Sequence, residues 1–81
     1  MIVLKEVEET VAQTLIEIGQ QVRDRRQSLR LTQAGLADLA DCSTRFVGMV
    51  EGGKPTVRLD KLLDVLEAVG LELRATVRTV P

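Results

Sequence analysis

The chain has 81 residues, one cysteine, no histidine and a formal net charge of −1 at pH 7. A chain of this length forms one small domain that buries only about 60–65% of its extended surface, so we expect a partner chain to add stability. The lack of histidine and of paired carboxylates on a cleft-sized scaffold argues against an enzyme or a metal site, and we expect no cofactor. No apolar run approaches the roughly 18 residues of a membrane span, and the N-terminus has no signal-peptide pattern. We therefore predict one domain over residues 1–81 in the cytoplasm, where a single cysteine stays reduced.

The charges are unevenly distributed along the chain. Residues 1–20 carry one Lys against four Glu, and residues 62–81 carry two Arg against three acidic residues. The segment between them, residues 21–61, carries eight Lys/Arg against five Asp/Glu. Because a local positive field attracts phosphate even on a slightly acidic chain, this middle segment is compatible with nucleic-acid binding.

The first predicted element is a long helix from about residue 9 to residue 29. Residues 1–4, an apolar MIVL run, form an added strand, a frayed end or the first turn of this helix, and the pattern does not decide among them. Apolar residues at helical spacing predict its buried stripe, namely Val11, Leu15, Ile18, Val22 and Leu29.

The last third of this helix is basic. Its cations are Arg23, Arg25, Arg26 and Arg30. Positive charge near a helix C-terminus is favoured by the helix dipole, and the same side chains are also suited to DNA phosphate. Both interpretations stay open for Arg23, Arg25 and Arg30.

Residues 32–51, TQAGLADLADCSTRFVGMVE, predict two short helices joined by a tight turn. Thr32 caps the first helix, which buries Leu36, Ala37, Leu39 and Ala40. Ser43 caps the second, which buries Phe46, Val47 and Val50 and ends at the glycine pair that follows. Cys42 in the turn is a small apolar plug, with a redox switch as the alternative. The second helix leaves one face free, formed by Thr44, Arg45, Gly48 and Met49, as in a recognition helix for the DNA major groove.

The rest of the chain predicts a loop, a helix and a strand. Thr56 caps the helix, whose wide apolar face is Leu59, Leu62, Leu63, Leu66 and Val69. Residues 71–78 then alternate apolar and polar side chains, a pattern typical of a half-buried strand with Leu71, Leu73, Ala75 and Val77 on one face. A lone strand leaves its backbone groups unpaired, so we predict that it pairs with the same strand of a second copy about a two-fold axis.

Residues 18–77 resemble the helix-turn-helix of the phage-repressor-like (XRE) regulators, through LTQAGLADLA, STRFVGMVEGGKPT and LDKLLDVLEAVGLELRATV. The run EGGKPTVRLDKLLDVLEAVGLEL is most similar to HipB-like antitoxins. The resemblance implies a mainly α fold, a small domain of four to five helices with its core at about residues 12–70 and a C-terminal strand that pairs across a dimer. It also implies a structural ion pair between Arg26 and Glu51. At Arg30 and Asp41 the family usually has glycine with positive φ, so this chain departs from the family there.

The residues and the resemblance together predict a sequence-specific DNA-binding repressor. Arg45 suits a guanine edge, while Thr44 and Met49 suit a base edge or a thymine methyl group. Gln33 and Lys54 are placed on phosphates. The predicted DNA-binding set is Gln33, Ser43, Thr44, Arg45, Gly48, Met49 and Lys54, in which Ser43 acts first as a cap and Gly48 either lets the backbone approach the duplex or reflects drift.

The expected partners are double-stranded DNA with a palindromic operator and a second copy of the chain. The resemblance adds a HipA-like kinase toxin and repression of the protein's own operon. Two alternatives remain: a solitary XRE-like regulator without a toxin, and a helical interaction module that never contacts DNA.

Overall fold

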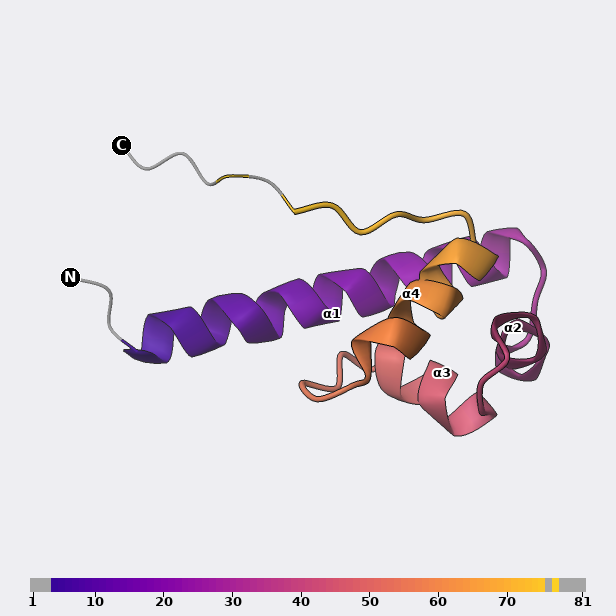
Figure 1. The fold of residues 1–81 in the computed structure, drawn as a ribbon, viewed down its shortest axis with the longest axis horizontal. Helices are drawn as coiled ribbons and strands as arrows, with labels where there is room; N and C mark the ends of the chain where they lie inside the picture. Colours follow the sequence, from indigo (N-terminus) through magenta and orange to yellow (C-terminus); the bar gives the residue numbers. More distant parts are fainter. Residues whose placement is uncertain (1–3, 76, 78–81) are drawn as a thin grey trace.

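The computed structural model describes residues 4–75 and residue 77 as four helices (Figure 1). In chain order they are α1 (Leu4–Ser28), α2 (Gln33–Ala40), α3 (Thr44–Glu51) and α4 (Leu59–Ala68). α1 contacts α3, and α2 contacts both α3 and α4. The prediction of a small, mainly α domain is confirmed. None of the described helices is long and apolar enough to cross a membrane.

α1 is longer than predicted and projects beyond the rest of the molecule. It begins at Leu4 rather than near residue 9, because the residues between them are mostly good helix formers. The other helices pack around its C-terminal half, so the molecule measures 45 Å along its longest axis and 21 Å across (Figure 1). The alternatives for residues 1–3 lie outside the described residues.

The predicted buried stripe of α1 is correct only in its middle. Val22 is fully buried and Ile18 packs against the core. Val11, in contrast, is 53% exposed, because none of the other three described helices lies beside the N-terminal half of α1 (Figure 1). Leu29 is 44% exposed because it follows the last residue of the helix.

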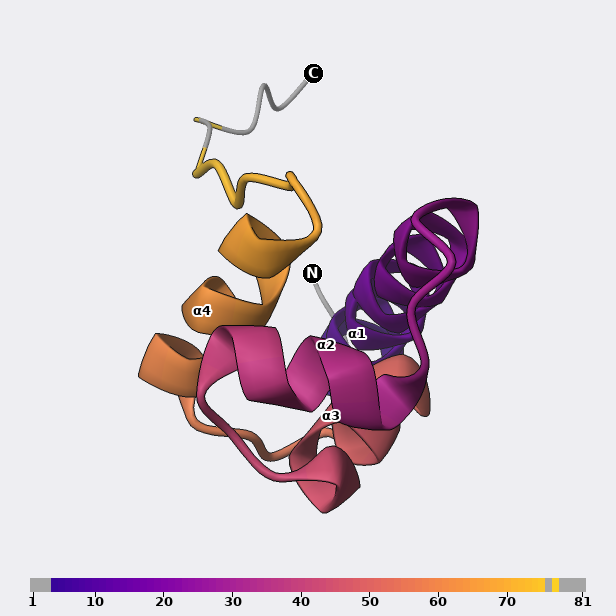
Figure 2. The same cartoon turned by 90° about the vertical axis from the view of Figure 1, so that its right-hand side faces the viewer.

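One apolar cluster packs the four helices against one another around the C-terminal half of α1. This end of the molecule faces the viewer in Figure 2. The predicted caps of α2 and α3 are confirmed: Thr32 Oγ1 accepts from the Gly35 N–H at 2.9 Å, and Ser43 Oγ accepts from the Phe46 N–H at 3.0 Å. Each such cap stabilises its helix by about 1 kcal/mol. The buried apolar residues are Val22, Leu36, Ala37, Ala40, Val47, Val50, Leu62, Val65, Leu66 and Val69.

Two predictions about α2 and α4 are wrong. Leu39, Leu59 and Leu63 are exposed rather than buried, because these short helices are covered along narrower faces than the apolar pattern suggests. Thr56 does not cap α4, which begins at Leu59 after Arg58 and has no side-chain cap.

Among the residues that the structure describes, two that are not glycine adopt left-handed backbone conformations. Arg30 has φ of 58° and Asp41 has φ of 53°, at the positions where the resemblance implied positive φ. Asp41 ends α2, and its carbonyl oxygen accepts a hydrogen bond from Lys61 Nζ at 2.9 Å. The turn between α2 and α3 is therefore tied to α4 although it lacks glycine.

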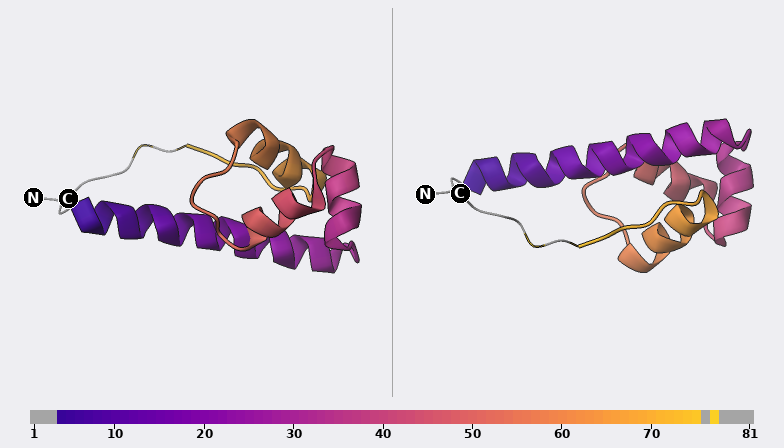
Figure 3. Two further views of the ribbon diagram at one scale, coloured as in Figure 1. Left: turned by 90° about the horizontal axis from the view of Figure 1, so that it is seen from below. Right: turned by 90° about the horizontal axis from the view of Figure 1, so that it is seen from above.

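The segment after α4 forms no strand in the single chain, as far as residues 71–75 and 77 are described. Gly70, with φ of 78°, ends α4, and the Leu71 N–H donates to the Leu66 carbonyl at 2.8 Å. Leu71 packs against the core, and the chain then runs back toward the N-terminal half of α1 (Figures 1 and 3). A strand needs a neighbouring strand, and the single chain supplies none among its described residues. Pairing across a dimer stays a prediction.

Candidate nucleic-acid interface

α3 is fixed at its C-terminal end by a buried carboxylate. The side chain of Glu51 is 0% exposed, and Arg26 binds it through two hydrogen bonds. Arg26 Nε donates to Glu51 Oε2 at 2.6 Å, and Arg26 Nη2 donates to Glu51 Oε1 at 3.0 Å. Arg26 Nη1 also donates to the Leu31 carbonyl at 2.9 Å. A bidentate arginine thus joins the end of α1, the loop before α2 and the end of α3.

Two further side chains donate to the same carboxylate. Arg23 Nε lies 3.4 Å from Glu51 Oε1, and Gln33 Nε2 lies 3.2 Å from it. Sequence reasoning missed both contacts, although Arg23 lies one helical turn before Arg26 and so shares its face of α1. Glu51 therefore joins α1, α2 and α3 at one point.

These contacts keep Glu51 ionised inside the protein. Burial alone raises the pKa of its carboxyl group, but the hydrogen bonds from Arg26, Gln33 and Arg23 and the charge of Arg26 outweigh burial and hold the pKa below its ordinary value. The hydrogen bond to Glu51 likewise raises the pKa of Arg26 above that of a free arginine. Both partners are charged at neutral pH, so loss of either one leaves a poorly solvated charge.

Of the basic residues at the end of α1, Arg25 has a different structural role. Arg25 Nε donates to the Val69 carbonyl at 2.9 Å and so holds the C-terminal end of α4. Arg30 is exposed and lies in the turn before α2. Three of the four arginines therefore bind acceptors within the protein, and a phosphate contact by any of the four stays a prediction.

The face of α3 that points away from the core carries the predicted DNA-binding residues. Thr44 and Arg45 are exposed at the start of the helix, while Gly48 and Met49 are half-buried along it. The opposite face is buried through Val47 and Val50. The structure thus presents a short polar surface on a helix whose position is fixed by the packing of its opposite face.

The other predicted residues flank this surface. Ser43 and Lys54 are exposed just before and after α3. Gln33 lies beside its middle, because a Cβ atom on Gly48 would be 3.9 Å from Gln33 Oε1. The structure thus places the predicted set on α3, on the residues just before and after it, and on the first residue of α2.

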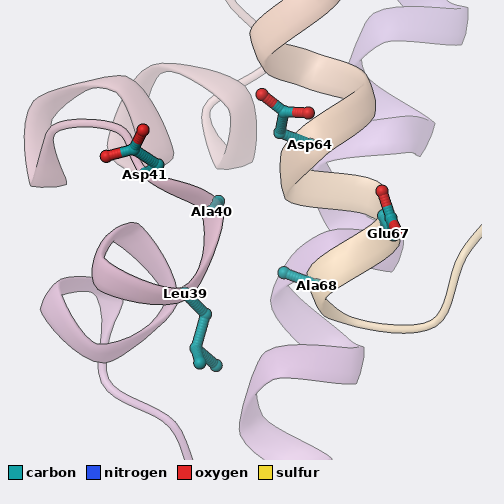
Figure 4. Close-up of a pocket in the computed structure, with 6 residues that line it drawn as sticks. All are labelled: Leu39, Ala40, Asp41, Asp64, Glu67 and Ala68. Carbon is teal, nitrogen blue, oxygen red and sulfur yellow. The ribbon is translucent and has the colours of Figure 1, made fainter.

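A second surface lies between α2 and α4. It carries negative charge, whereas Arg45 gives the exposed face of α3 a positive charge. It is an open groove of about 480 Å³ (Figure 4). Three carboxylates repel phosphate at this groove, so we exclude it from the nucleic-acid interface. Its lining residues are Leu39, Ala40, Asp41, Asp64, Glu67 and Ala68.

Cys42 packs against the core in the turn between α2 and α3. Burial raises the pKa of its thiol, and the carboxylates of Asp41 and Asp64 add to that effect while Lys61 opposes it. A raised pKa disfavours the reactive thiolate. The surroundings favour the apolar plug over the redox switch.

Comparison with known proteins agrees with this geometry. Residues 17–79 match the family of helix-turn-helix domains. The chain is also 38% identical over 60 residues to an uncharacterized HTH-type transcriptional regulator, y4mF, of Sinorhizobium fredii, a match that covers 74% of this chain and 79% of that protein. The predicted XRE-like helix-turn-helix is confirmed at the level of the family, and these matches do not extend to the antitoxin assignment. The chain belongs to the helix-turn-helix domain family.

Proposed function

We propose that this protein is a sequence-specific DNA-binding transcriptional repressor that inserts α3 into the major groove. The observation that carries the proposal is the division of α3 into two faces, one fixed by the core and by Glu51 and one that exposes Thr44 and Arg45. Membership of the helix-turn-helix family supports it, as does the similarity to a protein named as a transcriptional regulator.

In the proposed complex, phosphate contacts position the protein and base contacts select the sequence. Arg45 binds O6 and N7 of a guanine with its forked guanidinium group, and Thr44 and Met49 contact a neighbouring base edge or thymine methyl group. Lys54 contacts a phosphate. Gln33 also contacts a phosphate. One N–H of its side-chain amide donates to Glu51 in the structure, and the second N–H is the one that donates to the phosphate.

The repressor acts as a homodimer in this proposal. One helix-turn-helix offers few base contacts, so two are needed on a palindromic operator whose half-sites lie about 34 Å apart or a multiple of that distance. The segment after α4 is suited to dimerisation because Leu73 is 47% exposed and Val77 is 96% exposed. Antiparallel pairing centred on Leu73 places Glu72 of one chain opposite Arg74 of the other. The contact set is Leu71, Leu73, Ala75 and Val77.

Sedimentation at micromolar concentration tests the dimer. The parent should sediment as a dimer, and Leu73→Asp should sediment as a monomer with unchanged helix content. Thr14→Asp, an exposed change in α1, serves as the control. A monomeric parent contradicts the dimer and leaves DNA binding by single domains to be measured separately.

A more specific form of this proposal is that the repressor is a HipB-like antitoxin. Such a protein represses its own operon and binds a HipA-like kinase toxin. It rests on the similarity of the run EGGKPTVRLDKLLDVLEAVGLEL to that group. The neighbouring open reading frame provides the first test. A kinase gene there, with a product that co-purifies with this chain, supports the antitoxin, whereas its absence favours the solitary regulator.

DNA binding itself is tested with a library of random duplexes. The protein should enrich a palindromic sequence, and its affinity for that sequence should fall steeply with salt because binding releases phosphate counterions. If no duplex is bound at low salt, the chain is the helical interaction module instead.

A further inference from the structure

The described helices contain three glycines in their interiors, and the fold explains only two of them. Glycine inside a helix is less favourable than alanine, so each position needs a reason. A Cβ atom on Gly19 would lie 2.3 Å from the Val50 carbonyl oxygen, so α1 and α3 could not pack as closely. A Cβ atom on Gly35 would lie 3.3 Å from Thr32 Oγ1, the capping oxygen of α2.

Gly48 has no such neighbour. The nearest heavy atom to a Cβ built there is Gln33 Oε1, at 3.9 Å, which is an ordinary van der Waals contact. Its φ is not positive, so the backbone does not require glycine either. The folded chain has room for a methyl group at this position and gains nothing from its absence.

The position of Gly48 in α3 suggests what the missing side chain is for. It lies four residues after Thr44 and three after Arg45, so the three share one helix face. Thr44 and Arg45 are exposed, and Gln33 borders the same surface while its amide is held by Glu51. A gap in the centre of this face lets the helix backbone approach any surface that Thr44 and Arg45 contact.

We infer that Gly48 is a specificity-determining position, where a base-pair edge occupies the space that a side chain would fill. This inference rests on the proposed DNA-binding function. Non-specific binding depends on phosphate contacts and does not require α3 to reach the bases. A side chain at residue 48 should therefore hinder the specific complex and leave the non-specific complex unchanged.

The test compares Gly48→Ala with Thr14→Ala. Both changes place alanine in a helix, and Thr14 is exposed on α1, outside the helix-turn-helix. The parent protein first selects its preferred duplex from a random library. Each variant is then titrated by fluorescence anisotropy against the selected duplex and a scrambled duplex, and its urea unfolding midpoint is measured.

We expect Gly48→Ala to have an unfolding midpoint equal to or above that of the parent. Its affinity for the selected duplex should fall at least about fivefold, the size of a single mismatched base pair, with no change for the scrambled duplex. Gly48→Leu should lose more affinity for the selected duplex. Thr14→Ala should bind both duplexes as the parent does.

The outcomes separate this inference from the proposed function. If the parent selects no duplex, the proposed function fails and the inference fails with it. If the parent selects a duplex that Gly48→Ala binds equally well, only the inference is overturned. Equal losses on both duplexes would make residue 48 a general contact, and a lower unfolding midpoint would show that the fold itself needs glycine. Either result overturns the inference.

Discussion

The two faces of α3 differ in their contacts with the rest of the protein. On the buried side, Val47 and Val50 lie in the core and Glu51 accepts four hydrogen bonds from three side chains. On the exposed side, no described hydrogen bond joins the side chains of Thr44 and Arg45 to the rest of the protein. Substitutions on the first side should therefore destabilise the fold, and substitutions on the second should change binding without destabilising the fold. The predictions below test that separation.

The largest effect is expected for Glu51→Ala. It leaves Arg26, whose side chain is only 13% exposed, without its carboxylate, which should cost about 3 kcal/mol of unfolding free energy. The total free energy of unfolding of a small domain is only about 5–15 kcal/mol, so the urea midpoint should fall markedly. The double variant Arg26→Met with Glu51→Leu is the control and should lose much less than the sum of the single changes. A parental midpoint for Glu51→Ala would show that the carboxylate contributes nothing.

The same carboxyl group predicts how stability depends on pH. Its pKa is lowered in the folded protein, so its contribution is complete above the ordinary pKa of glutamate, about 4.3, and is lost as the pH falls through the lower, folded value. Urea midpoints measured between neutral pH and pH 3 should fall in acid. Glu51→Gln, which cannot titrate, should show a shallower fall, and equal slopes for the two proteins would contradict this assignment.

A smaller effect is expected for Gly19→Ala in α1. The added Cβ atom would lie 2.3 Å from the Val50 carbonyl oxygen, so the two helices must move apart at a cost of about 1–3 kcal/mol. Alanine at residue 48 provides the contrast, because there the same change should stabilise the helix by up to about 1 kcal/mol. Urea unfolding of both variants gives the comparison, and shifts of the same sign would mean that the packing difference is not real.

Local chemistry explains which parts of this structure were predictable from sequence. The caps at Thr32 and Ser43 depend on residues three positions away, so the pattern alone predicted them. Exposure of Leu39 was not predictable, because it depends on which side of α2 the other helices cover. The role of Gly19 was likewise hidden, since its neighbour in space is a carbonyl of α3.

The candidate site shows the same limit. A resemblance, rather than periodicity, implied that Arg26 and Glu51 meet, and the structure brings them together. Nothing in the sequence indicated that Gln33, assigned to a phosphate, also donates to that carboxylate. Long-range convergence of side chains on one buried group is set by the fold and leaves no periodic signal.

The last prediction concerns the exposed side of α3 and compares Arg45→Ala with Lys54→Ala. Arg45 is the single cation within α3, whereas Lys54 lies in the loop that follows. Arg45→Ala should cost about 1–3 kcal/mol on the selected duplex and relax the preference at one base pair in each half-site. Lys54→Ala should weaken binding to all duplexes alike and lower the salt slope by about one unit for each domain bound.

The contrast between these two variants is informative because any basic surface binds DNA less tightly after it loses a charge. Both proteins are titrated against the selected and the scrambled duplex over a range of salt concentrations, and both should unfold at the parental urea midpoint. If Arg45→Ala loses equal affinity for the two duplexes, Arg45 contacts phosphate rather than a base. Sequence selection would then depend on Thr44, on Met49 or on the shape of the DNA. If Arg45→Ala instead unfolds more easily than the parent, the exposed face of α3 also supports the fold, and the separation between the two faces fails.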